Sequence, residues 1–149
     1  MRAIPLLVLS LIALAAAETR PDFSGSWKLN VDKSDVQEPK LKGAVFKINH
    51  REPVFIVSRT LLYESETKNM TFQLRTNGAP IIVPYGDDKL NLAMRWDDGS
   101  LVCSIKDSAD PETYAEKVNY RLSPDGKVLT VTEHQKDRPR VWVFSREIK

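Results

Sequence analysis

The sequence predicts an all-β protein: an antiparallel up-and-down meander closed into a single barrel of about eight to ten strands. Short segments along the chain alternate apolar and polar residues, the pattern of strands that bury one face. Turns with Asn-Gly or Asp-Gly, typical of tight hairpins, occur at Asn77-Gly78, Asp98-Gly99 and Asp125-Gly126. No segment shows the apolar spacing of an amphipathic helix. Hairpin turns favour a meander over a Greek key.

The first expected strand lies at 22–30 and is the segment around which the barrel should form. Phe23, Trp27 and Leu29 fall on one side of a period-two pattern, and polar residues fall on the other. Gly25 shares the apolar side, where the lack of a side chain leaves room for another group to approach the backbone. This strand should therefore be half-buried, with Trp27 as its anchor.

Nine further strands are expected downstream. Segment 54–62 is almost continuously apolar and rich in β-branched residues, which suits a strand covered on both faces. Segment 81–85 lies between Pro80 and Pro84 and should be an edge strand or an irregular crossover. The remaining expected strands are 44–50, 70–75, 89–96, 101–106, 114–122, 128–133 and 141–148.

The N-terminus has the features of a secretory signal. Arg2 supplies a positive charge, 4–14 is a short apolar run, and 15–17 is Ala-Ala-Ala, with cleavage expected before Glu18. The apolar run is shorter than the ~20 residues of a membrane span. We therefore expect a signal peptide at 1–17 and one barrel domain at 18–149, secreted or periplasmic, with no integral membrane segment in the mature chain.

Composition and motifs argue against several classes of function. The formal net charge is +2 with both signs interspersed, so no basic patch suggests nucleic acid. His50 and His134, the two histidines, have no second ligand at metal-binding spacing, and we expect no metal and no cofactor. No nucleophile elbow or phosphate loop is present, so we expect no enzyme.

Cys103 is the single cysteine and should pack as a small hydrophobe. We expect a monomer.

Inward-facing residues are the candidates for contact with a ligand. A barrel of about eight strands either fills its interior with side chains or holds one small molecule. Glu116 shares a side of its strand with Tyr114 and Val118; it either orients a ligand inside or lies wet at a strand end. The candidate ligand-binding residues are Phe46, Phe72, Met94, Glu116, Tyr120 and Trp142.

Phe23-Ser24-Gly25-Ser26-Trp27-Lys28-Leu29 resembles the opening strand of the calycin superfamily: the lipocalins, the fatty-acid-binding proteins and their bacterial lipocalin-like relatives. The resemblance implies a barrel that binds or carries a small hydrophobic molecule without catalysis. It also implies that Trp27 packs under a basic side chain, with Arg146 the first candidate and Arg140 the second. Gly25, Trp27 and Arg146 would then close one end of the barrel.

Two departures from the fatty-acid-binding pattern are visible. Trp142-Val143-Phe144 stands where those proteins carry an Arg-x-Tyr pair for the ligand carboxylate, and 32–42 is too short for a helical lid, so we expect an open mouth.

The alternative function is a non-catalytic envelope or periplasmic interaction or inhibitor module with a packed barrel and no ligand. A weaker third option is an enzyme with Glu116 as acid or base. A cavity of ~300 Å³ or more would favour the carrier.

Overall fold

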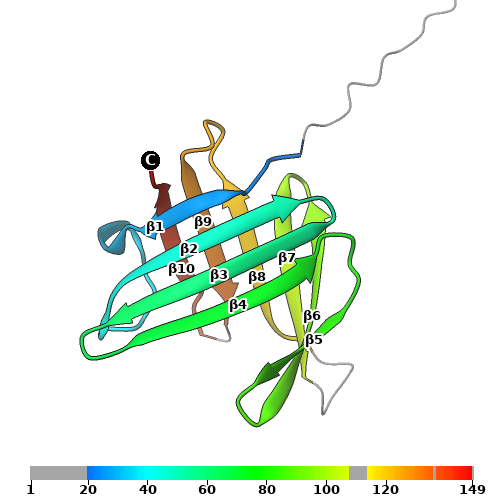
Figure 1. Cartoon of the computed structure of the whole chain (residues 1–149), viewed down its shortest axis with the longest axis horizontal. Helices are drawn as coiled ribbons and strands as arrows, with labels where there is room; N and C mark the ends of the chain where they lie inside the picture. Colours follow the sequence, from blue (N-terminus) through cyan, green and yellow to red (C-terminus); the bar gives the residue numbers. More distant parts are fainter. Residues whose placement is uncertain (1–19, 108–113, 136, 149) are drawn as a thin grey trace, which may run out of the picture.

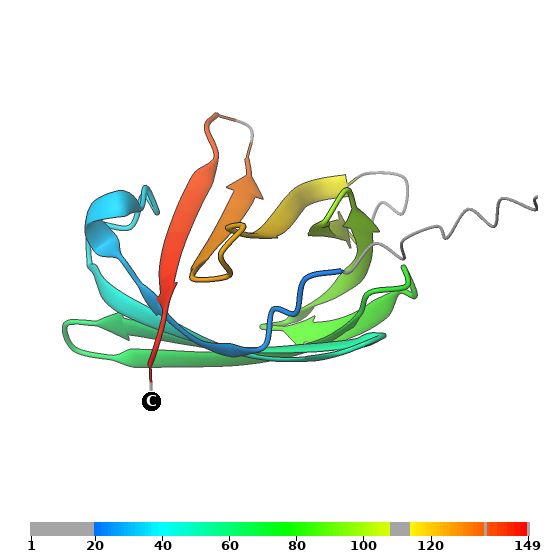
Figure 2. The same ribbon diagram turned by 90° about the horizontal axis from the view of Figure 1, so that it is seen from above.

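The computed structural model describes residues 20–107, 114–135 and 137–148, which form one antiparallel sheet of 10 strands rolled into a nearly closed barrel (Figures 1 and 2). The predicted all-β meander is confirmed. The strands are β1 (Gly25–Leu29), β2 (Leu41–Arg51), β3 (Val54–Tyr63), β4 (Thr67–Arg75), β5 (Ile81–Tyr85), β6 (Asp88–Asp97), β7 (Ser100–Asp107), β8 (Tyr114–Leu122), β9 (Val128–His134) and β10 (Arg140–Arg146).

The strand order is β4-β3-β2-β1-β10-β9-β8-β7-β6-β5. Strand β1 pairs with both β2 and β10, so the first and last strands lie side by side. Within the described residues, β4 and β5 are the only consecutive strands without a ladder between them, and this is where the barrel stays open. Pro84 lies in β5, which is an edge strand, the first of the two alternatives expected for 81–85, and a missing N–H is tolerated there.

The predicted signal segment, 1–17, lies outside the described residues. In the described part of the chain the one helix is η1 (Val31–Lys33), and no helix there has the length and apolar character needed to cross a membrane. The segment between β1 and β2 thus contains a single short 3-10 turn.

Strand β3 corrects one expectation. The sequence predicts that 54–62 is covered on both faces, but only one face is buried, through Phe55, Val57 and Leu61. Leu62, on the opposite face of the strand, is 39% exposed. The period-two alternation of a half-exposed sheet therefore holds here, and Arg59 shares the buried face.

One end of the barrel is closed by Trp27, Gly25 and Arg146. The Arg146 guanidinium carbon lies 4.2 Å from the centroid of the fully buried Trp27 ring. Arg146 donates from Nη1 to the Ser24 carbonyl (2.6 Å) and from Nε to the Gly126 carbonyl (3.2 Å). Gly25 has a φ of +145°, and a Cβ there would lie 2.5 Å from Arg146 Nη1. Only glycine suits both the backbone conformation and the close guanidinium.

A polar network lies beside this closed end. Nδ1 of the buried His50 accepts from the Phe23 backbone N–H (3.2 Å), so the ring proton is on Nε2, which donates to Glu52 (3.0 Å). Glu52 also accepts from Trp96 Nε1 (2.8 Å) and from the Thr76 hydroxyl. Burial raises the pKa of Glu52, but these hydrogen bonds outweigh it and hold the pKa below its ordinary value of 4.5.

Removing the Thr76 hydroxyl should weaken the pH dependence of stability. Because the pKa of Glu52 is lowered by folding, its contribution is present above the unfolded value of 4.5 and lost as the pH falls through the folded value. Thr76→Val should therefore be less stable than wild type at about pH 7, with the difference shrinking below about pH 4.

Urea unfolding across this pH range measures the effect. The matched control is Thr60→Val, because the Thr60 hydroxyl donates to the neutral side chain of Asn69. Its stability difference should not vary with pH. A pH-independent difference for Thr76→Val would contradict the assigned role of Glu52.

Candidate functional site

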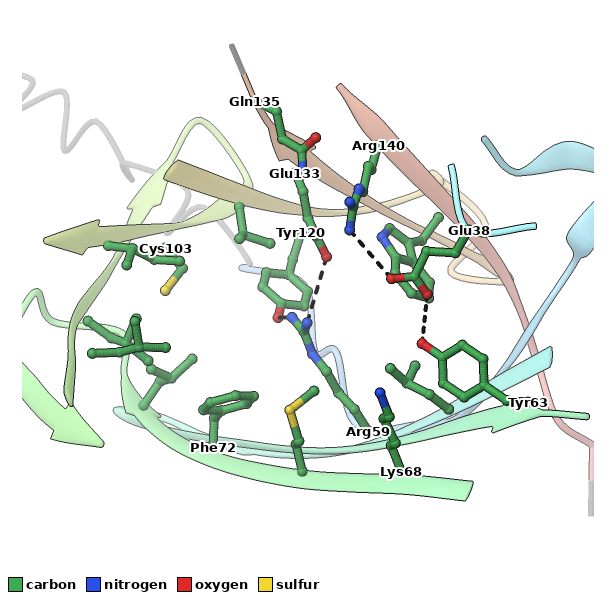
Figure 3. Close-up of a pocket in the computed structure, with 18 residues that line it drawn as sticks. Glu38, Arg59, Tyr63, Lys68, Phe72, Cys103, Tyr120, Glu133, Gln135 and Arg140 are labelled. Atoms are coloured by element: carbon green, nitrogen blue, oxygen red, sulfur yellow. Dashed lines mark hydrogen bonds and ion pairs between the residues drawn. The ribbon is translucent and has the colours of Figure 1, made fainter. Parts of the chain in front are cut away.

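The barrel encloses a cavity of about 590 Å³ (Figure 3). Strands β3, β4, β6, β7, β8 and β10 supply its apolar wall, because each contributes inward-facing residues at period two. The volume lies well within the range of small-molecule sites, ~300–1,000 Å³. The apolar lining residues are Leu61, Met70, Phe72, Leu74, Leu90, Leu92, Ile105, Val118 and Trp142.

The predicted aromatic candidates and Met94 divide between the cavity wall and the core. Phe72, Tyr120 and Trp142 line the cavity. Phe46 and Met94 are fully buried and do not line it, so we assign them to the core behind the wall. The Phe46 ring packs against the Trp142 ring, with centroids 5.7 Å apart, and so supports the wall from behind.

Glu116 was expected either inside the barrel or at a wet strand end. Its backbone pairs with Ile105 in the β7–β8 ladder. Its side chain lies outside the described residues, so its role as a ligand-orienting group or as an acid or base stays a prediction.

A buried arginine that sequence reasoning missed occupies the cavity. Arg59 lies on the inner face of β3, and its side chain is 15% exposed. Its guanidinium carbon lies 4.8 Å from the Phe46 ring centroid and 5.7 Å from that of Phe72. One signal was present in the sequence: Arg59 lies two residues from both Val57 and Leu61, so the three share one face of the strand. Because apolar residues stand on both faces of this strand, the signal was obscured.

Tyr120 and Glu133 stabilise the charge of Arg59. Arg59 donates from Nη2 to the Tyr120 hydroxyl oxygen (2.6 Å), and its Nη1 lies 3.7 Å from Glu133 Oε1 (Figure 3). Burial lowers the pKa of Arg59, but these neighbours outweigh it and the net pKa is raised, so the guanidinium stays charged. Burial raises the pKa of Tyr120, which keeps the phenol neutral. The barrel interior is therefore not purely apolar.

A second polar group lies on the side of the cavity away from Cys103 (Figure 3). Arg140 Nη1 is 3.6 Å from Glu38 Oε1, and the Tyr63 hydroxyl donates to Glu38 Oε2 (2.7 Å). The hydrogen bond to Glu38 raises the pKa of Tyr63 to about 12. Arg140, the second candidate partner of Trp27, thus lines the cavity. Glu38 ties the segment before β2 to Tyr63 on β3 and to Arg140 on β10.

Cys103 is buried at 5% exposure and also lines the cavity. Burial raises the pKa of its thiol to about 11, so it is a thiol rather than a thiolate at neutral pH. Among the described residues no group of three or more His, Cys, Asp or Glu side chains could hold a metal ion.

We expect Cys103 to react slowly with iodoacetamide. A rise in pKa from 9.0 to about 11 lowers the thiolate fraction roughly 100-fold near pH 8, and burial slows the reaction further. Mass spectrometry of the labelled chain, with the urea-unfolded chain as the reference, measures the ratio of rates. Equal rates in the folded and unfolded chains would contradict the buried position.

Comparison of the sequence finds no matching family model and no matching curated protein. Comparison of the structure finds the same fold in solved proteins. Human cRBP IV superposes with a TM-score of 0.64 at 16% identity, over 86% of this chain and 100% of its own. The REP1-NXSQ fatty acid transporter gives 0.63 at 12% identity, over 86% of this chain and 98% of its own. The predicted calycin-type barrel is thereby confirmed as a fold.

Proposed function

We propose that this protein binds or carries a small hydrophobic molecule inside its barrel, without catalysis, and that it does so as a secreted or periplasmic monomer. The observation that carries the proposal is the cavity of about 590 Å³ with its largely apolar wall. An apolar ligand there would gain roughly 25 cal/mol for each Å² removed from water, before the costs of association.

Two further observations support a carrier. A packed barrel without a ligand, the alternative reading of the sequence, would fill its interior with side chains and leave no space of this volume. One of the solved structures with the same fold is, by its printed name, a fatty acid transporter.

A cavity-filling variant should weaken binding of an apolar fluorescent probe. Ile105 lines the cavity, and Ile105→Trp should occupy part of it and lower probe affinity about tenfold or more, which corresponds to ~1.4 kcal/mol. The matched control is Ile82→Trp, because Ile82 is 66% exposed on the edge strand β5 and does not line the cavity.

Fluorescence titration measures both variants, and circular dichroism checks that each is folded. Native mass spectrometry of protein from its own source should in addition show a co-purified small molecule. Absence of probe binding by the wild type, or equal binding by wild type and folded Ile105→Trp, would contradict a ligand site in the barrel.

A further inference from the structure

Three buried N–H donors of the cavity lining have no hydrogen-bond partner among the described residues: Nε of Arg59, Nε of Arg140 and Nε1 of Trp142. All three residues line the cavity, and Trp142 is 4% exposed. We call these three N–H groups the donor cluster. Buried donors are almost always paired in folded proteins, so three in one cavity indicate a place for an acceptor that the described part of the chain does not supply.

The donor cluster gathers at the wall formed by β9 and β10: Arg140 and Trp142 stand on β10, and Arg59 reaches this wall from β3 (Figure 3). Arg140 and Trp142 are two residues apart on β10, so their side chains leave the same face of the strand. Arg59 and Trp142 both contact the Phe46 ring, at 4.8 Å and 5.7 Å from its centroid. Glu133 is the cross-strand partner of Arg140 and lies 3.7 Å from Arg59. All three residues therefore meet at this part of the cavity lining.

The charges of this wall are already compensated. Arg59 lies beside Glu133 at 3.7 Å, and Arg140 lies beside Glu38 at 3.6 Å. A ligand carboxylate would approach two arginines but also two carboxylates, and their repulsion offsets much of the attraction. The unpaired N–H groups are directional donors, and a neutral oxygen can accept from them without adding a charge.

We propose that the cavity takes an uncharged, largely apolar molecule whose carbonyl or hydroxyl oxygen accepts a hydrogen bond from the donor cluster. The apolar remainder of the molecule lies along Phe72, Leu74 and Leu92. This inference rests on the proposed function and narrows its ligand class. The cavity should bind neutral ketones, esters and alcohols more tightly than free fatty acids or plain hydrocarbons.

A ligand-by-variant comparison tests the hydrogen bond. The ligands are the dodecyl hydrocarbon, methyl ketone, alcohol and carboxylic acid, each competed against the same apolar fluorescent probe. In Trp142→Phe, which keeps the aromatic ring but removes a donor, the ratio of ketone affinity to hydrocarbon affinity should fall about 3- to 10-fold. Comparing ratios cancels the different solubilities of the ligands in water.

Trp96→Phe is the matched control. Trp96 Nε1 already donates to Glu52, and Trp96 does not line the cavity, so the same substitution there should leave the ketone-to-hydrocarbon ratio unchanged. An unchanged ratio in Trp142→Phe, or an equal fall in Trp96→Phe, would overturn the donor cluster as the recognition element.

The charge compensation has its own test. In the wild type, the acid should bind more weakly than the alcohol. In Glu133→Gln, where Arg59 loses a neighbouring carboxylate, the acid-to-alcohol ratio should rise about tenfold. A strong preference of the wild type for the acid would overturn this inference and leave the proposed carrier function intact. Binding of none of the four ligands would overturn the carrier function itself.

Discussion

Trp27→Ala is expected to lower the free energy of unfolding by about 3–5 kcal/mol, the usual range for truncating a large buried aromatic residue. Trp27 is fully buried, and its Nε1 donates to the Phe23 carbonyl (3.1 Å). It pairs with Phe46 on one side and Arg146 on the other, so it stands where β1 joins β2 to β10. The variant loses both the packing and the surface on which Arg146 rests.

Urea unfolding monitored by circular dichroism measures this loss. Trp27→Phe is the control, because it keeps much of the apolar volume and should lose clearly less stability than alanine. A loss below about 1 kcal/mol for Trp27→Ala would show that the opening strand does not anchor the barrel.

Glu133→Gln is expected to destabilise the protein by about 2–4 kcal/mol. Its carboxylate lies 3.7 Å from Arg59, and the two side chains are only 13% and 15% exposed. The substitution leaves the Arg59 charge with less compensation. Removing one partner of a buried ion pair costs more stability than the intact pair contributes. A loss of stability near the lower end of this range would indicate that water entering the cavity partly solvates the Arg59 charge.

The double variant Arg59→Met/Glu133→Gln separates this effect from other contacts of Glu133. Replacing both charges removes the uncompensated cation, so the double variant should recover most of the lost stability. Chemical unfolding of wild type, both single variants and the double variant gives the coupling between the two sites. Additive losses in the double variant would argue against electrostatic coupling across the barrel.

The sequence by itself determines the strand meander of this protein. Alternation of apolar and polar residues and the Asn-Gly and Asp-Gly turns are local signals, and they predict the ten strands. The opening segment around Trp27 resembles that of the calycins, and this resemblance makes Arg146 the first candidate for the basic side chain that packs on Trp27. The structure puts the Arg146 guanidinium over the Trp27 ring.

Only the tertiary structure decides what the barrel encloses. Within 54–62 both parities carry apolar residues, so the face on which Arg59 lies depends on which side of β3 turns inward. The meeting of Arg59 with Tyr120 and Glu133 depends on strands far apart in the sheet order coming together when the sheet curls. Periodicity fixes which residues share a face, whereas closure and register fix which of them meet across it. For the same reason Phe72 and Trp142 line the cavity while Phe46 and Met94 lie in the core.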